Sequence, residues 1–579
     1  MQDGRWITRP CDWSGVQALA EALDVSDTLA TVLVRRGLRD PADASAFLAA
    51  EPPGHDPSTL GDITVAVERI RAAVAARERI CVHGDYDVDG ISATAVAVLV
   101  LRELGANVEF RLPSRFEEGY GLAAGTIEQL AADGVDLVLT VDCGITAVDE
   151  VARARELGVD VIVTDHHRPG ETLPDCPIVA TRPSAYPFPE LCGAGVVHTL
   201  ARALLGDDHP AVARVLDLVA LATIADVVPL VDENRALAAA GLRVLARTGR
   251  PGLQELMRVA RVDPAAVDAT AVAFRLAPRI NAAGRLGRPD VALELLLTED
   301  RARARELAAT LEELNRERQG VEERILREAV AAVESWPAET RARRGYVLWN
   351  EGWHEGVIGI VASRLVERFH RPVVLVARSG EGWKGSGRSI SDFDLHGGLA
   401  ACAEHLARFG GHRAAAGLTV ATEQLQPFAD AFGRYADTAL ADADLRPLTT
   451  VDAIVSRRCA DSRPRAGARP ARAVRAGKPR ADPSRRERGG NGGEHRGGGE
   501  APTLPRPAAG ARRRLRDRLR SRAAARPAPA LRPHRRRVPP QGEPLERHRG
   551  AAARRPARVR RSGRVRRASR VARRRVARR

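Results

Sequence analysis

The sequence has few of the features that mark secreted, disulfide-bonded or membrane-spanning proteins. Its seven cysteines are an odd number and include no Cys-x-x-Cys pair, which argues against a disulfide framework or a zinc knuckle. It has no stretch of about 18 consecutive apolar residues, and no apolar core follows a basic start, so neither a membrane span nor a signal peptide is predicted. These absences predict a soluble cytoplasmic protein that has no membrane partner.

Acidic residues are scarce at one end of the chain only. The formal net charge is +16, but residues 457–579 hold 42 Lys and Arg against 8 Asp and Glu, a net of +34. Residues 1–456 therefore hold 48 basic and 66 acidic side chains, a net of −18. Since an acidic body with a basic tail is not a uniformly basic nucleic-acid binder, the overall charge by itself predicts no function.

The order of the apolar runs predicts an α/β fold with two lobes. Residues 1–60 show apolar residues at helical spacing and form a small helical lead-in. Within 61–300, short apolar runs alternate with Ala-rich helical stretches, the pattern of a parallel sheet covered on both faces. A charged helix with an apolar stripe is predicted for 301–335, where it connects to a second α/β segment at 336–450.

Three of the predicted strands end in the same kinds of side chain, acidic residues and histidines: His83, Asp85, Asp87 and Asp89 after the first, Asp142 after the second, and Asp165, His166 and His167 after the third. Ligands bind at the carboxyl ends of strands in open α/β sheets, so this placement favours a site. In an extended segment Asp87 and Asp89 would point the same way and address one locus.

A group of carboxylates as dense as this one requires a cation, because the charges would otherwise repel one another and take up protons. Oxygen ligands mixed with imidazole suit Mn²⁺ or Mg²⁺. Two such ions about 3.5 to 4 Å apart can activate a water molecule and stabilise the leaving oxygen of a phosphate ester. A single DxD or HH motif is more often a turn, a cap or a surface feature, so the prediction depends on their joint occurrence.

The motifs HGDYDVDG, VDCG, TDHH and LVALATIADVVPL resemble, in this order, the phosphoesterase motifs of the DHH superfamily in the form found in the RecJ family. The resemblance continues through APRINAAGRLG, WHEGVIGIVASRL, GSGRSI and FGGHRAAAG, the last marking a DHHA1 domain, and it covers about residues 1–456. It implies a DHH domain at 61–300, a connecting helix at 301–335, a DHHA1 domain at 336–450 and the start of an OB region from 451.

The resemblance implies a role for each residue of the cluster. His83, Asp87 and Asp142 would hold one metal ion, while Asp89, Asp142, His166 and Asp226 would hold the other, so that Asp142 bridges the two. His167 would contact the scissile phosphate, and Asp165 would orient the histidines. From the sequence alone, Asp226 after an apolar helix is more often a helix-end solvating group.

The substrate implied by the resemblance is single-stranded DNA, degraded from 5′ to 3′ into nucleoside monophosphates during repair and recombination. In GSGRSI, glycines allow close backbone approach while Ser386 and Arg388 offer donors to a terminal 5′-phosphate. The other expected phosphate contacts are Arg115, Arg279 and His412, whereas His354 is as readily structural. A helicase and a single-strand-binding protein are the expected protein partners.

Three alternatives remain open. A DHH oligoribonuclease or nucleotide phosphatase is disfavoured because such relatives are shorter and lack the RFEEGYGL and APRINAAGR segments. A catalytically inactive scaffold of the same superfamily is disfavoured by the complete set of Asp and His ligands. A basic DNA-packaging protein would rest only on the tail, so truncation at about residue 456 would abolish its DNA binding.

The tail from residue 457 contains no Phe, Tyr, Trp, Ile or Met, so it cannot bury enough apolar area to fold and is predicted to be disordered. One interpretation is a basic DNA-binding tail. A second is suggested by the RecJ family, in which an OB fold follows the DHHA1 domain; LTTVDAIVS resembles the approach to that fold before the similarity stops. An Arg/Ala/Pro/Gly-rich text is typical of a GC-rich gene translated out of frame.

Back-translation supports the second interpretation. Residues 474–481 (VRAGKPRA) and 538–549 (VPPQGEPLERHR) can be encoded so that a start one base later reads FGQGNPG and YHRKVNRWNGTV. Both readings are similar to segments of the family's OB region, in the expected order and at one common offset. The hypothesis is a one-base frameshift near residues 456–458 that destroys the OB fold, and resequencing the DNA tests it.

Overall fold

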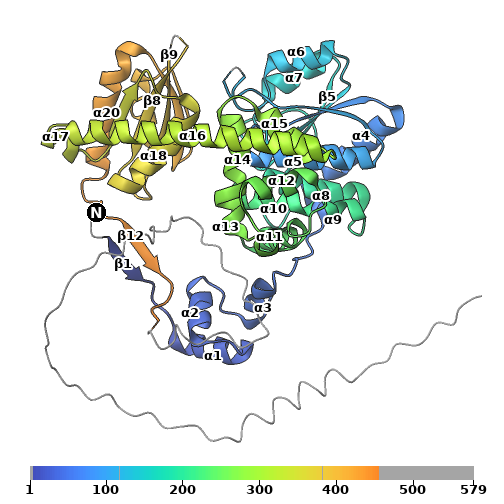
Figure 1. The fold of residues 1–579 in the computed structure, drawn as a ribbon, viewed down its shortest axis with the longest axis horizontal. Coiled ribbons are helices and arrows are strands. Elements are labelled where there is room, and N and C mark those ends of the chain that lie inside the picture. Colours follow the sequence, from blue (N-terminus) through green and yellow to red (C-terminus); the bar gives the residue numbers. More distant parts are fainter. Residues whose placement is uncertain (1–3, 117, 381, 456–579) are drawn as a thin grey trace, which may run out of the picture. The chain divides into compact units, whose positions relative to one another are not determined.

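The computed structural model describes residues 4–455, apart from positions 117 and 381 (Figure 1). The predictions for the tail, which are disorder and an OB fold lost through a frameshift, lie outside these described residues. No helix within the described part of the chain has both the length and the apolar character needed to span a membrane.

The first lobe is built on a parallel sheet of five strands in the order β3-β2-β4-β5-β6. The strands are β2 (Arg79–His83), β3 (Asn107–Arg111), β4 (Leu137–Val141), β5 (Asp160–Asp165) and β6 (Ile178–Ala180). The helices packed on the sheet are α4 (Ile63–Ala76), α5 (Val88–Glu103), α6 (Ala124–Ala132), α7 (Val148–Glu156) and α8 (Gly193–Leu205). The predicted α/β class with a parallel sheet is therefore confirmed.

Both faces of this sheet are buried, which explains why its strands read as apolar runs. Val82 and Leu139 point to one face, into a core shared with α4, α5 and α8. Cys81 and Val138, their neighbours along the strands, point to the opposite face, into a core shared with α6 and α7. Because successive side chains of a strand point to opposite faces, this alternation buries one face of the sheet against α4, α5 and α8 and the other against α6 and α7.

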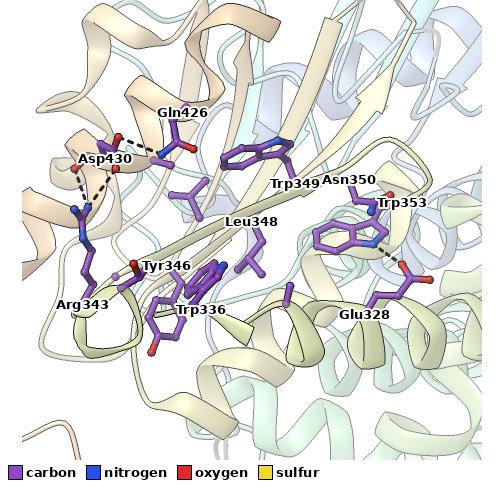
Figure 2. Close-up of a pocket in the computed structure, with 15 residues that line it drawn as sticks. Glu328, Trp336, Arg343, Tyr346, Leu348, Trp349, Asn350, Trp353, Gln426 and Asp430 are labelled. Atoms are coloured by element: carbon purple, nitrogen blue, oxygen red, sulfur yellow. Dashed lines mark hydrogen bonds and ion pairs between the residues drawn. The ribbon is translucent and has the colours of Figure 1, made fainter. Parts of the chain in front are cut away.

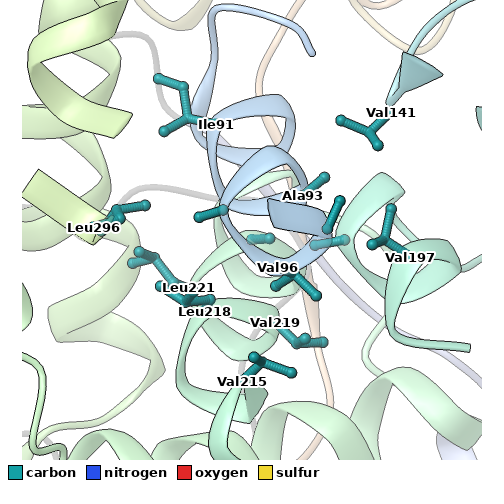
Figure 3. Close-up of a cluster of buried hydrophobic side chains, with 14 of the residues drawn as sticks. Ile91, Ala93, Val96, Val141, Val197, Val215, Leu218, Val219, Leu221 and Leu296 are labelled. Carbon is teal, nitrogen blue, oxygen red and sulfur yellow. The ribbon is translucent and has the colours of Figure 1, made fainter. Parts of the chain in front are cut away.

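A group of helices completes the first lobe. They are α9 (Pro210–Arg214), α10 (Leu216–Ala225), α11 (Asp232–Leu245), α12 (Pro251–Val259), α13 (Ala269–Ala271), the π-helical turn η3 (Val272–Leu276), α14 (Ala277–Arg285) and α15 (Pro289–Leu297). Helix α10 is apolar on every side, as expected of a fully buried helix. Its Leu218 and Leu221 pack near Ile91 and Val96 of α5 (Figure 3).

A long helix, α16 (Arg301–Ser335), begins at the side-chain cap Asp300 and spans the residues for which the sequence predicts the connecting helix. Its length of 35 residues corresponds to about 52 Å. Leu307 and Leu311 in its first half belong to the core of the first lobe. Ile325 and Val333 in its second half belong to a core of the second lobe, so one apolar stripe serves both.

The second lobe contains a mixed sheet of five strands in the order β10-β11-β9-β8-β7, in which only β7 and β8 are parallel. Its strands are β7 (Tyr346–Asn350), β8 (Val373–Ser379), β9 (Gly382–Arg388), β10 (Arg408–Gly411) and β11 (Ala415–Val420). Its helices are α17 (Ala338–Ala342), α18 (Glu355–Phe369), α19 (Leu395–Ala400) and α20 (Leu425–Ala439). The cores place α16 and α18 on one face, and α19 and α20 on the other.

The N-terminal segment contains helices, as its apolar spacing predicts, and one strand that the sequence did not predict. Helices α1 (Trp13–Leu23), α2 (Asp27–Arg35) and α3 (Pro41–Ala49) share a small core of their own. Before them, β1 (Arg5–Thr8) pairs in parallel with β12 (Leu448–Val451). Its partner is more than 400 residues away in the chain, so local apolar spacing could not reveal this strand.

The remaining elements are short 3₁₀ helices: η1 (Pro57–Thr59), η2 (Pro264–Ala266), η4 (Ala403–His405) and η5 (Thr422–Gln424).

Candidate metal centre

The first acidic motif lies where β2 ends and α5 begins. Asp87 is the N-cap of α5, and its Oδ1 accepts hydrogen bonds from the backbone N–H groups of Asp89 and Gly90, at 2.9 and 3.1 Å. Asp89 therefore lies in the first helical turn. The expectation of an extended segment is wrong, because the helix starts between the two residues, but both carboxylates still belong to adjoining groups of possible ligands.

Asp89 is held at the start of a second helix. Its carboxylate accepts hydrogen bonds from the N–H groups of Gly193 and Ala194, at 2.6 and 2.8 Å, in the first turn of α8. The positive ends of two helices thus favour negative charge at this point. Asp89 is only 2% exposed, so a charge there needs this compensation.

Asp142 occupies a strained position just after β4. Its backbone has a φ of 62°, a left-handed conformation that is uncommon for residues other than glycine, although asparagine and aspartate adopt it more often than most. Its carboxylate Oδ1 lies 3.1 Å from Nε2 of His166. A Cβ at Gly193 would lie 2.8 Å from that same oxygen, so the glycine leaves room for the carboxylate. Strain of this kind is often retained where a side chain must be aimed at a ligand.

Asp165 orients the two histidines that follow it at the end of β5. Its Oδ1 accepts hydrogen bonds from the N–H groups of His166 and His167, at 2.7 and 3.0 Å, and lies 2.8 Å from Nδ1 of His167. Its Oδ2 accepts from the N–H of Ile145 at 3.0 Å. Because both oxygens are occupied, Asp165 has little capacity left for a metal ion and acts on its neighbours.

His167 is further fixed by Tyr120, whose hydroxyl donates to the carbonyl of Asp142 at 3.2 Å and lies 3.0 Å from Nδ1 of His167. Burial alone would lower the pKa of His167. The hydrogen bond to Asp165 and the charges of Asp165, Asp226 and Asp89 outweigh burial and raise that pKa to about 9. His167 therefore favours the protonated, positively charged form.

The possible ligand atoms form three mutually close groups, each with all its atoms within 4.8 Å of one another. The groups are Asp85, Asp87 and Asp142; Asp89, His166 and Asp226; and Asp142, His166 and His167. Two of them share Asp142 and two share His166, so the groups adjoin one another. Asp226, the C-cap of α10, is brought in beside His166, with its Oδ2 3.9 Å from Nε2.

His83 and Asp85 differ from the expected arrangement. His83 belongs to none of the three groups; its Nε2 lies 3.3 Å from the carbonyl of Gly121, and burial lowers its pKa to about 4. Asp85, for which no ligand role was expected, joins Asp87 and Asp142. Within the described chain, the buried Nδ1 of His83 and Oδ1 of Asp85 have no hydrogen-bond partner, which leaves both able to bind an ion.

The electrostatics of the cluster require a cation. Burial, followed by the charge of Asp87, raises the pKa of Asp85 to about 8. Burial and the charges of Asp89 and Asp87 likewise raise the pKa of Asp226 to about 8. The pKa of Asp142 is raised well above its ordinary value, by burial first and then by its acidic neighbours. Divalent ions would remove this penalty.

Three arginines come together at a second place. The guanidinium of Arg388 donates to Oγ of Ser386 at 3.1 Å, and that of Arg285 donates to the carbonyl of Gly356 at 3.2 Å. Arg115 lies over the ring of Tyr86, at 4.9 Å. Burial, and then the charges of Arg115 and Arg388, lower the pKa of Arg285 to about 10. Mutually repelling guanidinium groups of this kind favour an anion between them.

Two predicted phosphate contacts lie elsewhere. Arg279 forms an ion pair with Glu312 of α16, with Nε 2.6 Å from Oε2. His412 is exposed after β10, and its backbone N–H donates to the carbonyl of Ala415. His354 caps α18 by accepting from the N–H of Gly356 at 3.1 Å, in agreement with the structural interpretation.

The sequence motifs gave Asp85 no role of its own and did not single out Tyr120, Asn281 or Arg285. The Oδ1 of Asn281 accepts from the N–H of Val88 at 3.2 Å and so fixes the start of α5. Both Asn281 and Arg285 lie within the APRINAAGRLG segment. The three polar residues of that segment were the available signal, but only the packing of α14 shows which of them face the site.

Comparison with known proteins agrees with this arrangement. The N-terminal domain model of the DHH family matches residues 79–223, and the DHHA1 domain model matches residues 343–438. The single-stranded-DNA-specific exonuclease RecJ of Bacillus subtilis is 41% identical over 456 residues, which are 78% of this chain and 57% of that protein. The chain thus spans little more than half the length of that relative.

Two further relatives are matched over a larger share of their own length. RecJ of Dickeya dadantii is 42% identical over 407 residues, 66% of this chain and 71% of that protein. The crystal structure of RecJ in complex with Mn²⁺ from Thermus thermophilus superposes with a TM-score of 0.66 at 36% identity, over 77% of this chain and 63% of that chain. With both domain models matched and most of the Dickeya protein covered, this chain belongs to the RecJ family.

Proposed function

We propose that the protein is a two-metal-ion exonuclease that hydrolyses single-stranded DNA from its 5′ end and releases nucleoside 5′-monophosphates in DNA repair and recombination. The observation that carries the proposal is the convergence of five carboxylates and His166 from four separate segments of the chain into adjoining groups. The names of the relatives, single-stranded-DNA-specific exonucleases, support the substrate.

The residues of the cluster fit two hard divalent ions. Asp85, Asp87 and Asp142 would hold one, with His83 beside them, and Asp89, His166, Asp226 and Asp142 would hold the other. Carboxylate oxygens and neutral imidazole suit Mn²⁺ or Mg²⁺, and the Thermus relative contains Mn²⁺. Such ions, when bound, activate water and stabilise charge on a phosphate ester.

The chain's own groups then position the substrate. His167, kept protonated by Asp165, would donate a hydrogen bond to an oxygen of the scissile phosphate. Arg115, Arg285 and Arg388, with Ser386, would hold the terminal 5′-phosphate. The charge of Arg115 lowers the pKa of Asp85, and the charge of Asp87 raises that of Arg285, so the arginines act on the cluster at short range. Arg279 and His412 would contact the strand further along.

The proposal extends to partners and location. An exonuclease for single strands needs duplex DNA to be opened, so a helicase and a single-strand-binding protein are the partners we infer. DNA as substrate, together with the six free cysteines of the described residues, favours the reducing cytoplasm.

Digestion of 5′-labelled single-stranded DNA with Mn²⁺ tests the proposal. The parent chain should release labelled mononucleotides, while Asp142→Ala should lose at least about a thousandfold in rate. Asp232→Asn is the matched control, because Asp232 is an acidic residue six positions beyond Asp226 that pairs with His55 outside the cluster. Equal activity of the parent and Asp142→Ala would remove the mechanism.

Two other functions predict different results in the same assay. An oligoribonuclease would cleave dinucleotides faster than long single-stranded DNA, and a scaffold protein would show no metal-dependent hydrolysis with either substrate.

A further inference from the structure

A groove with a volume of about 350 Å³ follows one edge of the second sheet and shares no lining residue with the metal centre. All of the residues from Gly345 to Asn350 line it, so β7 contributes both side-chain faces and its free backbone edge. Glu328 of α16 and Trp336, which follows the end of α16, form one wall, and Gln426 and Asp430 of α20 form the other (Figure 2).

The edge of β7 that faces this groove is open. Strand β7 pairs only with β8, and the N–H of Tyr346 donates to Pro372 on that side. By the alternation of a strand, the N–H and C=O groups of Val347 and Trp349 point the other way, into the groove. Neither N–H group has an acceptor among the described residues. No proline or charged residue of β7 blocks the edge, although exposed edges are usually protected in this way.

Several side chains of the groove also have no hydrogen-bond or ion-pair partner among the described residues. The indole N–H of Trp353 donates to Glu328 at 2.8 Å, but those of Trp336 and Trp349 have no acceptor within the part of the chain described. Glu328 likewise has no basic side chain beside it among the described residues, whereas Asp430 has Arg343 at 3.6 Å. The groove therefore offers apolar rings, backbone and indole donors, backbone acceptors and one uncompensated carboxylate.

We propose that this groove binds an extended peptide segment of another protein, which adds to the sheet as a further strand beside β7. Main-chain donors and acceptors of the peptide would pair with Val347 and Trp349, which is how strand addition obtains its affinity. Because Trp349 and Trp336 lie on opposite faces of the sheet, an apolar side chain on one face of the added strand would lie against Trp349. A basic side chain on its other face would lie beside Trp336 and face Glu328. This binding site is independent of the exonuclease function proposed above.

Two other occupants fit less well. Single-stranded DNA needs a positively charged groove, whereas the lining here has two carboxylates and only Arg343, which is already beside Asp430. A second copy of this chain would bring its own α16 and α20 on either side of its β7. Those helices would meet the walls of the groove before the two strands could pair.

The test uses synthetic hexapeptides in which valine alternates with lysine, or with glutamate as the control series. The sequence has six tryptophans, so the indole N–H signals of ¹⁵N-labelled full-length protein are few and can be assigned by single substitutions. The lysine peptide should shift the signals of Trp336 and Trp349 saturably and leave those of Trp6 and Trp13 unchanged. Glu328→Gln should weaken its binding about two- to fivefold.

N-methylated peptides test the strand pairing without changing the protein. Two isomers carry methyl groups on alternate backbone nitrogens. The isomer whose methylated nitrogens face β7 should not bind, whereas the isomer methylated at the other nitrogens should bind as before. Equal binding of the two isomers, or no shift with any peptide, would overturn the proposal. So would shifts caused by an oligothymidylate alone, which would indicate a nucleic-acid site, or by raised protein concentration alone, which would indicate a dimer.

Discussion

At the scale of single residues, hydrogen-bond partners separate side chains that look alike in the sequence. Arg388 and Arg279 were both expected to bind phosphate, but Arg388 lies among other guanidinium groups and Arg279 is paired with Glu312. Asp165 and Asp142 are both buried, yet Asp165 is saturated with hydrogen bonds while Asp142 faces His166. Residues of the same type therefore differ in whether they are free to bind a ligand or are already paired within the protein.

Arg388→Ala should reduce kcat/KM on 5′-phosphorylated single-stranded DNA by about 10- to 100-fold, because a charged hydrogen bond contributes about 1.5 to 3 kcal/mol. On 5′-hydroxyl DNA the same variant should differ little from the parent. Arg279→Ala is the matched control and should not discriminate between the two ends. An equal loss on both substrates for Arg388→Ala would contradict the assignment of the arginines.

His198 of α8 provides a prediction on pH. Its ring is buried, and neither ring nitrogen has a side-chain or backbone partner among the described residues. Burial, and then the charge of Arg202, lower its pKa to about 4. The folded protein thus keeps His198 neutral, whereas the unfolded chain takes up a proton once the pH falls below about 6.5. The stability contributed by the neutral ring is therefore present above pH 6.5 and is lost as the pH falls toward 4.

His198→Leu should remove this loss. Urea unfolding of the metal-free protein between pH 7 and pH 4 should give a parent whose free energy of unfolding falls more steeply than that of the variant, by on the order of 3 kcal/mol over the range. Parallel curves for the two proteins would show that His198 does not titrate in this way.

At the scale of elements, α14 is the piece that places the first acidic motif. Asn281 accepts a hydrogen bond from the first residue of α5, and a Cβ at Gly284 would lie 2.2 Å from the carbonyl of Tyr86. Helix α14 therefore packs against the loop between Asp85 and Asp87 so closely that an added methyl group would not fit. A helical segment about 200 residues further along the chain sets the conformation of the metal loop.

Gly284→Ala should displace this loop and weaken Mn²⁺ binding about tenfold or more, as supporting contacts around metal ligands commonly do. Gly320→Ala is the control, because Gly320 is an exposed position of α16 where a Cβ meets no atom within 4 Å. That change should leave Mn²⁺ binding unaltered and stabilise the fold by about 0.5 to 1 kcal/mol. Calorimetric titration and thermal unfolding measure the two effects, and unchanged Mn²⁺ affinity in Gly284→Ala would contradict the role given to α14.

At the scale of the whole molecule, the carboxylate cluster lowers the free energy of unfolding. Asp89, Asp142 and Asp165 are almost completely buried at the ends of helices and strands from different parts of the first lobe. Without a cation their mutual repulsion opposes the packing of those elements. Ion binding and folding are therefore coupled, since anything that binds only the folded state stabilises it.

Addition of Mn²⁺ at about one hundred times its dissociation constant should raise the free energy of unfolding by about 2.7 kcal/mol per independent site. Chelation should reverse the gain. Asp142→Asn should unfold at a higher temperature than the parent when both are metal-free, because it removes a carboxyl group that the fold must either bury as a charge or protonate, and should respond weakly to Mn²⁺. An Asp142→Asn variant that Mn²⁺ stabilises as strongly as the parent would contradict the coupling.

The sequence by itself determined the α/β class, the connecting helix and the set of acidic and histidine residues, because these depend on local apolar periodicity and on motifs of adjacent residues. Only the tertiary structure decided that Asp87 and Asp89 belong to adjoining groups of ligands, that Asp85 joins the cluster, that Arg285 rather than Arg279 lies with Arg115 and Arg388, and that β1 pairs with β12. Each of these depends on contacts between residues far apart in the chain, whose positions are set by packing of the whole fold and leave no periodic signal in the sequence.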